Sequence, residues 1–310
     1  MKLQTIRHSA ARRIHIARPL LLTGATVAIL AGCNSSAPVT PGPGPNDPGI
    51  ITTIAGVGGT AGFNGDGGAA KSATLYWPQD VAMSPAGNIV VLDWNNHRVR
   101  EISAATNLLS TIVGSGQLGD GTSGPAVQVN MNHPTGVAWD AQGRMIVAAW
   151  HNWKLKRVNT DGTISVIAGT SQGFAGDGGL AVGATPPAQL DLPSSIAFDA
   201  AGNMYVSDEG NGRIRLVDSN GMIHTCAGLG GLGFAGDGGP AAAARFSWPT
   251  GSDAHPSGRL TIDAERNLLY VADTNNNRVR VIDLATGMIN TFAGTGAAAF
   301  SGDAGVATAA

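Results

Sequence analysis

Glutamate is scarce in this chain: only Glu101, Glu209 and Glu265 occur among its 21 acidic residues, and the others are aspartate. Charged residues make up 13% of the 310 positions and aromatic residues 5%, whereas glycine alone supplies 45 residues. Aspartate and glycine favour turns, and exposed helix faces would need more glutamate, so long solvated helices are disfavoured. The hydrophobic fraction of 43% is enough to bury a core. The composition therefore indicates a β-rich globular protein and argues against wholesale disorder.

Positive charge is scarce everywhere except near the start of the chain. Five of the 19 Lys and Arg residues lie within residues 1–18, and no acidic residue occurs within 1–32. The remaining 14 basic residues face 21 acidic ones, which gives residues 33–310 a net charge of −7. Nucleic-acid binding normally needs a basic patch that displaces counterions from phosphates. The sequence therefore argues against nucleic acid, and equally against an anionic membrane surface, as a partner of the folded part.

Residues 1–32 predict an export signal. A basic segment is followed by the apolar stretch 19–31, which is too short to span a bilayer comfortably. The stretch ends in a run that resembles the lipobox of bacterial lipoproteins, Leu30-Ala31-Gly32-Cys33. This resemblance implies acylation of Cys33, and Asn34 is not the aspartate associated with inner-membrane retention. We expect an exported protein that is lipid-anchored at the outer membrane or cell surface. The alternative is an ordinary secretory signal that ends near a cysteine.

Residues 33–49 predict a flexible tether, because five prolines among Ser, Thr, Gly and Asn leave too little apolar surface to fold. The globular body is expected over residues 50–310. Its one cysteine, Cys226, has no partner for an internal disulfide once Cys33 is acylated. Cys226 precedes an Ala-Gly pair, and the equivalent position in the other repeats holds an apolar residue. Cys226 is therefore predicted to be a small core residue with no reactive role.

The body repeats one unit four times. The four copies begin at Trp77, His133, Leu192 and Trp248, each followed by proline, and are spaced by 56, 59 and 56 residues. Each copy contains an apolar run, a Gly/Asn turn, a second run, and a polar turn that leads into Arg-Val-Arg or its equivalent. Four short strands per period are typical of β-propeller blades. We expect blades near 77–114, 133–169, 192–228 and 248–294.

The repeat resembles the NHL family of β-propellers, named for an Asn-His-Leu-like tripeptide that appears here as Asn96-His97-Arg98. The likeness covers residues 51–310. The Gly-Asp-Gly-Gly linkers between units resemble those of bacterial secreted proteins and teneurins. The repeats depart from the family pattern in two ways: Ala149 replaces the recurring aspartate in the second repeat, and the central histidine becomes Trp153, Gly212 or Asn277. The resemblance implies an all-β fold of four-stranded blades in a ring that usually has six of them.

Only four complete blades are visible in the sequence. Residues 50–54 are expected to form the outermost strand of another blade, and a fifth linker begins at Gly302-Asp303. Unpaired strand edges invite aggregation. We therefore expect a six-bladed propeller that is incomplete at its C-terminal end, with the missing strands in a longer reading frame or another chain, rather than a closed four-bladed ring.

Two recurring groups invite a metal-binding interpretation, and both are better explained as structure. The first is an Asp-x-x-Asn-x-Arg column, Asp93/Asn96/Arg98, Asp208/Asn211/Arg213 and Asp273/Asn276/Arg278. A group that recurs in nearly every blade predicts a general role, namely pinning the turn between the second and third strands. The second group, Gly-Asp-Gly-Gly, offers too few oxygen ligands for Ca²⁺ and lacks the helix and lysine of a phosphate cradle. Asx-type turns with glycine at positive φ are favoured, and we predict no metal site or cofactor.

A binding site is more plausible where a blade breaks its pattern. The second blade places Trp150, His151 and Trp153 in one turn. In propeller topology these turns and the linkers emerge on one face, which we expect to collect Trp94, His97, Trp150, His151, Trp153 and Glu209. Exposed aromatic rings rimmed by polar groups are typical of surfaces that bind glycans or proteins. The alternative is that the rings only cover neighbouring linkers.

Two functions from different classes remain open. The first is a non-enzymatic, lipid-anchored binding or scaffold protein of the cell envelope, with a protein or glycan partner. The second is a metal-dependent enzyme of the gluconolactonase or lyase kind, because the resemblance implies that such propellers take ligands from separate blades around their axis. No HExxH, Gly-x-Ser-x-Gly or Cys/His cluster occurs, and only Glu209 is a glutamate near an expected turn of that face. No catalytic residue is predicted, and fold alone does not separate the two functions.

Overall fold

The computed structural model describes residues 51–250 and 255–310. The predicted export signal, the predicted acylation site at Cys33 and the predicted tether lie outside these residues. Residues Thr52–Ala310 form one compact unit. In the described part of the chain, no helix has the length and apolar character needed to cross a membrane.

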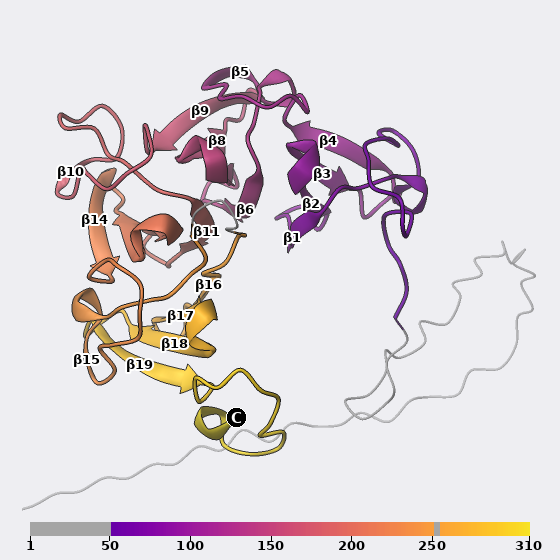
Figure 1. Cartoon of the computed structure of the whole chain (residues 1–310). Helices are drawn as coiled ribbons and strands as arrows, with labels where there is room; N and C mark the ends of the chain where they lie inside the picture. Colours follow the sequence, from indigo (N-terminus) through magenta and orange to yellow (C-terminus); the bar gives the residue numbers. More distant parts are fainter. Residues whose placement is uncertain (1–50, 251–254) are drawn as a thin grey trace, which may run out of the picture. The chain divides into compact units, whose positions relative to one another are not determined.

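The strands of the described residues form four antiparallel sheets, which follow one another along the chain (Figure 1). In chain order the strands are β1 (Pro78–Met83), β2 (Ile89–Asp93), β3 (Arg98–Ile102), β4 (Leu109–Val113), β5 (Ser123–Pro125), β6 (Pro134–Trp139), β7 (Met145–Ala149), β8 (Lys154–Val158), β9 (Thr163–Ala168), β10 (Gly179–Leu180), β11 (Pro193–Phe198), β12 (Met204–Asp208), β13 (Arg213–Val217), β14 (Met222–Ala227), β15 (Gly239–Pro240), β16 (Leu260–Asp263), β17 (Leu268–Asp273), β18 (Arg278–Asp283) and β19 (Met288–Ala293). The sheet orders are β1-β2-β3-β4, β5-β9-β8-β7-β6, β10-β14-β13-β12-β11 and β15-β19-β18-β17-β16.

Each sheet is one propeller blade, so the predicted all-β fold of four-stranded blades is confirmed. Blade 1 contains β1–β4, blade 2 β6–β9, blade 3 β11–β14 and blade 4 β16–β19. The linker before each of blades 2 to 4 adds a short strand to the outer edge of the blade that follows it, for example β5 beside β9. Before blade 1, the bridge Ala69–Leu108 occupies the same place. The linkers therefore belong to the blades that come after them.

Short 3-10 helices occupy two recurring places. One set forms the turn between the second and third strands of a blade: η2 (Trp94–Asn96), η4 (Trp150–Asn152), η5 (Glu209–Asn211) and η7 (Thr274–Asn276). The other set lies in the linkers: η1 (Ala70–Ser72), η3 (Ala126–Gln128), η6 (Ala241–Ala243) and η8 (Ala307–Ala309). The residue that ends each helix of the first set is left-handed, with φ of 54° at His97 and at Trp153. Glycine tolerates this conformation best, and Gly212 fills the position in blade 3.

The hydrophobic core lies between successive blades, because alternate residues of each strand face the neighbouring blade. Val90 and Leu92 of blade 1 meet Val147 of blade 2 in one such cluster. Equivalent clusters join blades 2 and 3 and blades 3 and 4. Cys226 packs against the last of these, and burial raises the pKa of its thiol to about 11. This placement matches the core role predicted for Cys226.

Among the described residues, no blade covers the face of blade 1 that points away from blade 2. Val81 and Met83 of β1 are 61% exposed, whereas Ile196, which holds the position of Val81 in blade 3, is 7% exposed. Residues 51–54 form no strand, so the strand predicted at 50–54 is wrong for its described part; Ile51 is 96% exposed and pairs with no described strand. The fifth linker is folded like the earlier ones, since the amide of Gly294 donates to the carbonyl of Ala307 just as Gly228 donates to Ala241. The six-bladed ring stays a prediction.

Candidate binding face

The recurring aspartates are parts of buried clamps that hold each blade to its linker. In blade 3 the Asp208 carboxylate accepts hydrogen bonds from the amide of Asp191 (2.7 Å) and from Nδ2 of Asn211 (2.9 Å). Arg215 Nη1 pairs with the same carboxylate at 3.1 Å, and its Nη2 reaches Asp177 of the preceding linker at 2.6 Å. Blades 1 and 4 repeat the arrangement as Asp93–Arg100–Asp66 and Asp273–Arg280–Asp237. Burial raises the pKa of Asp208 to about 6, and Arg215 opposes that rise.

The structural role predicted for the column agrees with these contacts, since Arg98 Nη1 donates to the carbonyl of Asn96 in the turn at 3.3 Å. The cation that pairs with the buried carboxylate, however, is a different arginine. In the register, Arg98 lies directly opposite Asp93, yet the carboxylate pairs with Arg100, its diagonal neighbour. Besides its bond to the turn, Arg98 donates to the carbonyl of Ser115 and stacks 3.6 Å from the ring centre of Phe63. The linker aspartate, which the sequence indicated only as a turn former, is the second carboxylate of each clamp.

Blade 2 keeps its clamp by a different set of contacts. Because residue 149 is alanine, blade 2 lacks the buried carboxylate. Asn152 Oδ1 takes its place and accepts hydrogen bonds from the backbone N–H of Asn132 (3.0 Å) and from Lys156 Nζ (3.3 Å). Lys154 and Lys156 both reach Asp120 of the linker, at 2.5 and 3.0 Å. The Asp→Ala departure in blade 2 is therefore compensated by a neutral amide and two lysines, and it leaves no buried charge unpaired.

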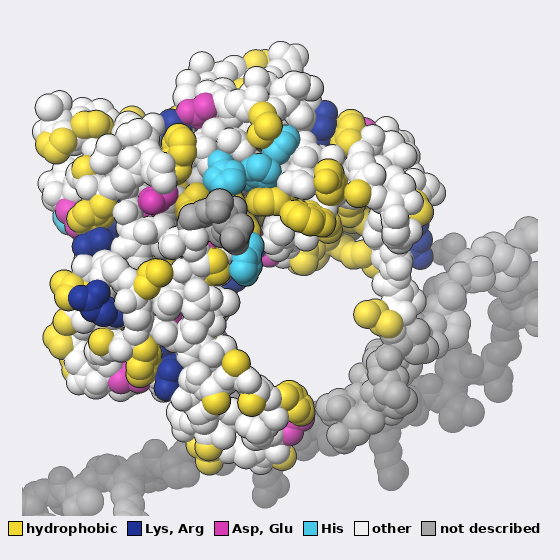
Figure 2. Space-filling view, viewed as in Figure 1, with side chains coloured by type: hydrophobic (Ala, Val, Ile, Leu, Met, Phe, Trp, Pro, Cys, Tyr) yellow, Lys and Arg dark blue, Asp and Glu magenta, His cyan; other side chains and the backbone are white. Residues whose placement is uncertain are grey.

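Five of the six predicted site residues meet on the face where the η2, η4 and η5 turns emerge. The ring centroids of Trp94 and Trp150 lie 6.0 Å apart, and those of Trp150 and His151 lie 4.3 Å apart. Trp150 Nε1 donates to Glu209 Oε2 at 3.1 Å. His97 joins the group through His133, described below. Figure 2 shows the histidine side chains gathered together on this face, next to hydrophobic ones.

The expectation of exposed aromatic rings is wrong for two of the tryptophans. Trp150 is 1% exposed and Trp94 8% exposed, because the two rings belong to one buried cluster with Leu192, which lies at the start of blade 3. Trp94 and Trp150 therefore follow the alternative interpretation, in which the rings pack on neighbouring parts of the protein and are not exposed for binding. Trp153 is half-buried and makes no ring contact with the group. The accessible part of the group is its imidazoles, since His97, His133 and His151 are all half-buried.

His133 is the central residue that the sequence did not single out, because it marks the start of a repeat. Its ring centroid lies 4.1 Å from that of Trp94. Its Nδ1 lies 2.8 Å from Nδ1 of His151, and its Nε2 lies 3.2 Å from Asn95 Oδ1. Its amide donates to Nδ1 of His97 at 3.4 Å. One sequence feature could have pointed to His133. The residue before the repeat proline is polar in the second blade and apolar, Trp or Leu, in the other three. The name "histidine cluster" is used below for His97, His133 and His151 with Trp94, Trp150 and Glu209.

The three histidines of the cluster are neutral at neutral pH. Burial, then the neighbouring His97 and His151, lowers the pKa of His133 to about 3, and burial also lowers the pKa values of His97 and His151. Glu209 is fully buried, which raises its pKa to about 7, although hydrogen bonds from Ser257 and Trp150 oppose the rise. Over residues 51–250 and 255–310, no group of three or more His, Cys, Asp or Glu is arranged to hold a metal ion. The histidines of the cluster offer neutral hydrogen-bond donors and acceptors beside aromatic rings.

The buried Glu209 predicts a pH dependence of stability. Its pKa is raised in the folded state, so its carboxyl stabilises the fold while protonated, and this contribution is lost as the pH rises from its usual value of 4.5 to about 7. Over that pH interval the wild-type protein should lose on the order of 3 kcal/mol of its free energy of unfolding through this group, and Glu209→Gln should not show that loss. Urea unfolding of wild type and variant at half-unit pH steps measures the difference. The histidine contributions, which have the opposite sign, are common to both proteins and cancel. Parallel stability curves would contradict the raised pKa.

Repeated four-stranded antiparallel blades define a β-propeller. The NHL repeat model matches residues 75–102, and the chain is an NHL-repeat β-propeller. It is 33% identical to human teneurin-4 over 168 residues, which are 47% of this chain and 6% of teneurin-4. It is 28% identical to human NHL repeat-containing protein 2 over 261 residues, which are 73% of this chain and 34% of that protein. The chain thus spans a small part of these relatives.

Solved structures of other propellers share the fold at low sequence identity. An auxiliary nutrient binding protein from Bacteroides ovatus superposes with a TM-score of 0.50 and 15% identity, covering 76% of this chain and 50% of that one. A putative gluconolactonase has a TM-score of 0.45 and 15% identity, covering 70% and 63%. At this identity the likeness concerns the fold alone.

Proposed function

We propose that the chain is a lipid-anchored binding or scaffold protein of the bacterial envelope, which engages a protein or glycan through the face that carries the histidine cluster. The observation that supports this most is the convergence, on one face, of three half-buried neutral histidines from blades 1 and 2. None of the three takes part in a clamp. Side chains that the fold does not need, gathered at one place, are the best candidates for recognition.

The chemistry of this face suits an uncharged polar partner. Each neutral imidazole has one donor and one acceptor nitrogen, and the adjacent Trp94 and Trp150 rings hold the imidazoles of His133 and His151 in place. Trp77, 63% exposed and stacked on Trp94 with 6.0 Å between ring centroids, extends the aromatic surface to the rim. Aromatic faces beside neutral hydrogen-bonding groups fit both sugar rings and protein surfaces.

The proposal predicts that binding depends on the histidines of this face. A glycan array and a panel of purified envelope proteins are screened with the full chain, and the best ligand is titrated against variants. We expect His151→Gln to weaken binding at least tenfold, in the range of interface hot spots. His224→Gln, a half-buried histidine of β14 in the outer part of blade 3, is the matched control and should bind like wild type. Equal affinity of the two variants would refute the assignment of this face.

A metal-dependent lactonase or lyase is the second candidate, and Glu209 favours it. A fully buried carboxyl with a pKa raised to about 7, hydrogen-bonded to Trp150, resembles the tuned acid–base groups of catalytic sites. Lactone hydrolysis by the full chain, assayed with and without added divalent cations and repeated with Glu209→Gln, separates the two candidates. Turnover that is lost in the variant would favour the enzyme.

The anchoring part of the proposal predicts where the protein is found in the cell. Cys33→Ala should remove the acylation site and move the protein from the membrane fraction to the soluble fraction, with loss of metabolic lipid labelling. Cys226→Ala, which alters the other cysteine, should leave the protein in the membrane fraction. Continued membrane association of the Cys33→Ala protein would contradict a lipid anchor.

A further inference from the structure

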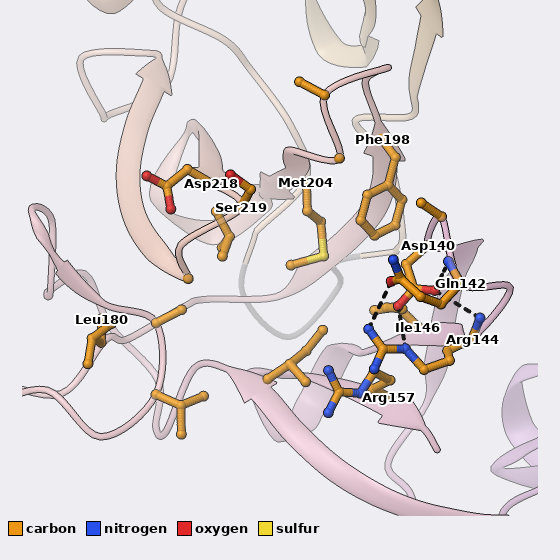
Figure 3. A pocket seen from close by; sticks show the side chains of 18 of the residues that line it. Asp140, Gln142, Arg144, Ile146, Arg157, Leu180, Phe198, Met204, Asp218 and Ser219 are labelled. Carbon is orange, nitrogen blue, oxygen red and sulfur yellow. Dashed lines mark hydrogen bonds and ion pairs between the residues drawn. The ribbon is translucent and has the colours of Figure 1, made fainter. Parts of the chain in front are cut away.

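Blades 2 and 3 leave a cleft of about 560 Å³ at the strand ends remote from the histidine cluster (Figure 3). Its walls come from the β6–β7, β11–β12 and β13–β14 turns, whereas the histidine cluster lies at the β7–β8 side of the same sheets. The volume falls in the range typical of small-molecule sites. The cleft is therefore a second location, independent of the proposed binding face.

A longer linker explains why the cleft forms between these two blades. Two buried alanines, Ala181 and Ala188, anchor the linker of blade 3, and Ala241 and Ala244 hold the same positions before blade 4. Six residues separate the first pair and two separate the second. The additional residues make residues 182–187 a largely exposed loop instead of a short turn over the blade interface. This local departure from the repeat coincides with the opening.

The floor of the cleft is apolar and one end of it is basic. Ile146 and Met204 are 1% and 4% exposed, and the Phe198 ring lies beside them (Figure 3). Arg157 occupies the position that Leu216 holds in blade 3, where leucine packs against the core between blades 3 and 4. A cation thus replaces an apolar side chain at this blade interface.

Arg157 has hydrogen-bonding capacity left over. Its Nε donates to Asn159 Oδ1 at 3.1 Å, and within residues 51–250 and 255–310 its two Nη groups have no hydrogen-bond or ion-pair partner. The neighbouring Arg144 is already paired with Asp140 at 2.7 Å. Asp218, on the opposite side in Figure 3, is held by the amides of Asn220 and Met222, which keep its pKa low. An anionic group in the cleft is therefore attracted to the Arg157 end and repelled from the Asp218 end.

We propose that this cleft binds a carboxylate with an unbranched apolar tail. The two Nη groups of Arg157 donate to the carboxylate in the fork geometry that suits it. The tail lies over Ile146, Phe198 and Met204, where the apolar surface of the tail itself leaves water. The ligand is a small amphipathic anion. The residues that bind it belong neither to the histidine cluster nor to the clamps.

The test follows the Met204 methyl group by NMR in the full chain labelled with ¹³C-methyl methionine, with Met204→Leu to assign the signal. Octanoate is titrated as the probe, with octanol as the tail without the charge and acetate as the charge without the tail. We expect a saturable shift of Met204 with octanoate, at least tenfold weaker binding of octanol, and no shift with acetate. Arg157→Leu, which copies the residue of blade 3, should weaken octanoate binding at least tenfold.

The controls separate a built site from general apolar association. Arg266→Leu alters an exposed arginine elsewhere, already paired with Asp263, and should leave octanoate binding unchanged. Melting temperatures confirm that the variants are folded, and Arg157→Gln replaces Arg157→Leu if that variant is not. The proposal is overturned if octanol binds as tightly as octanoate, if the Arg157 variant keeps wild-type affinity, or if the exposed Met83 shifts as much as Met204.

Discussion

Arg215→Ala is expected to destabilise the protein by about 3–5 kcal/mol, because it leaves the fully buried Asp208 carboxylate without its cationic partner. The same change also unpairs the linker aspartate, Asp177, and removes the guanidinium that lies 4.8 Å from the Phe174 ring centre. Denaturant unfolding of the full chain, read by tryptophan fluorescence and circular dichroism, measures the loss.

Asp177→Asn is the matched control, since it breaks the other arm of the same clamp. The Asp177 side chain is 36% exposed, and exposed ion pairs contribute about 0–1 kcal/mol. We therefore expect Asp177→Asn to cost no more than about 1 kcal/mol. A loss equal to that of Arg215→Ala would mean that the linker arm, and not the buried carboxylate, determines the stability of the clamp.

Trp150→Ala is expected to cost about 3–5 kcal/mol, which is the range for removing a large buried aromatic side chain. The ring is 1% exposed, packs against Trp94 and Leu192, and donates to Glu209. The variant leaves a cavity and removes one of the hydrogen bonds of a buried carboxyl. Urea unfolding at pH 6, below the pKa of Glu209, limits the contribution of its charge.

Trp153→Ala, three residues away in the same turn, is the comparison. Trp153 is half-buried and makes no ring contact with the cluster, so we expect a loss of at most about 1 kcal/mol. Comparable losses for the two variants would show that Trp153 is as important to the packing as Trp150. A negligible loss for Trp150→Ala would show that its ring is not held in the cluster.

The repeat made the fold predictable from the sequence. Short apolar runs that recur every 56 to 59 residues, separated by Gly, Asn and Asp, specify four strands per unit four times over. The clamp partners were less accessible, because Arg98 and Arg100 lie on the same side of β3 and their spacing alone does not say which one reaches Asp93. The assignment depends on where the preceding linker crosses the strand.

The site was predictable in its location but not in its exposure. Chain topology alone brings the Trp94, Trp150 and Glu209 turns to one face, and they meet there. Whether a ring on that face is covered depends on its neighbour in the next blade, here Leu192 beside Trp150, and no local pattern encodes that contact. His133 was missed because it marks the start of a repeat and its partners, His97 and His151, lie in other turns of the chain.

The pairing of each linker with the blade after it changes where the module boundary falls. A segment cut at the repeat proline, such as one that starts at Leu192, contains Asp208 and Arg215 but leaves Asp177 behind. A segment that starts after Gly169 and ends with β14 contains all three charges and the edge strand β10. The unit that can be duplicated, exchanged or grafted with its ion pairs intact is therefore linker plus blade, in that order.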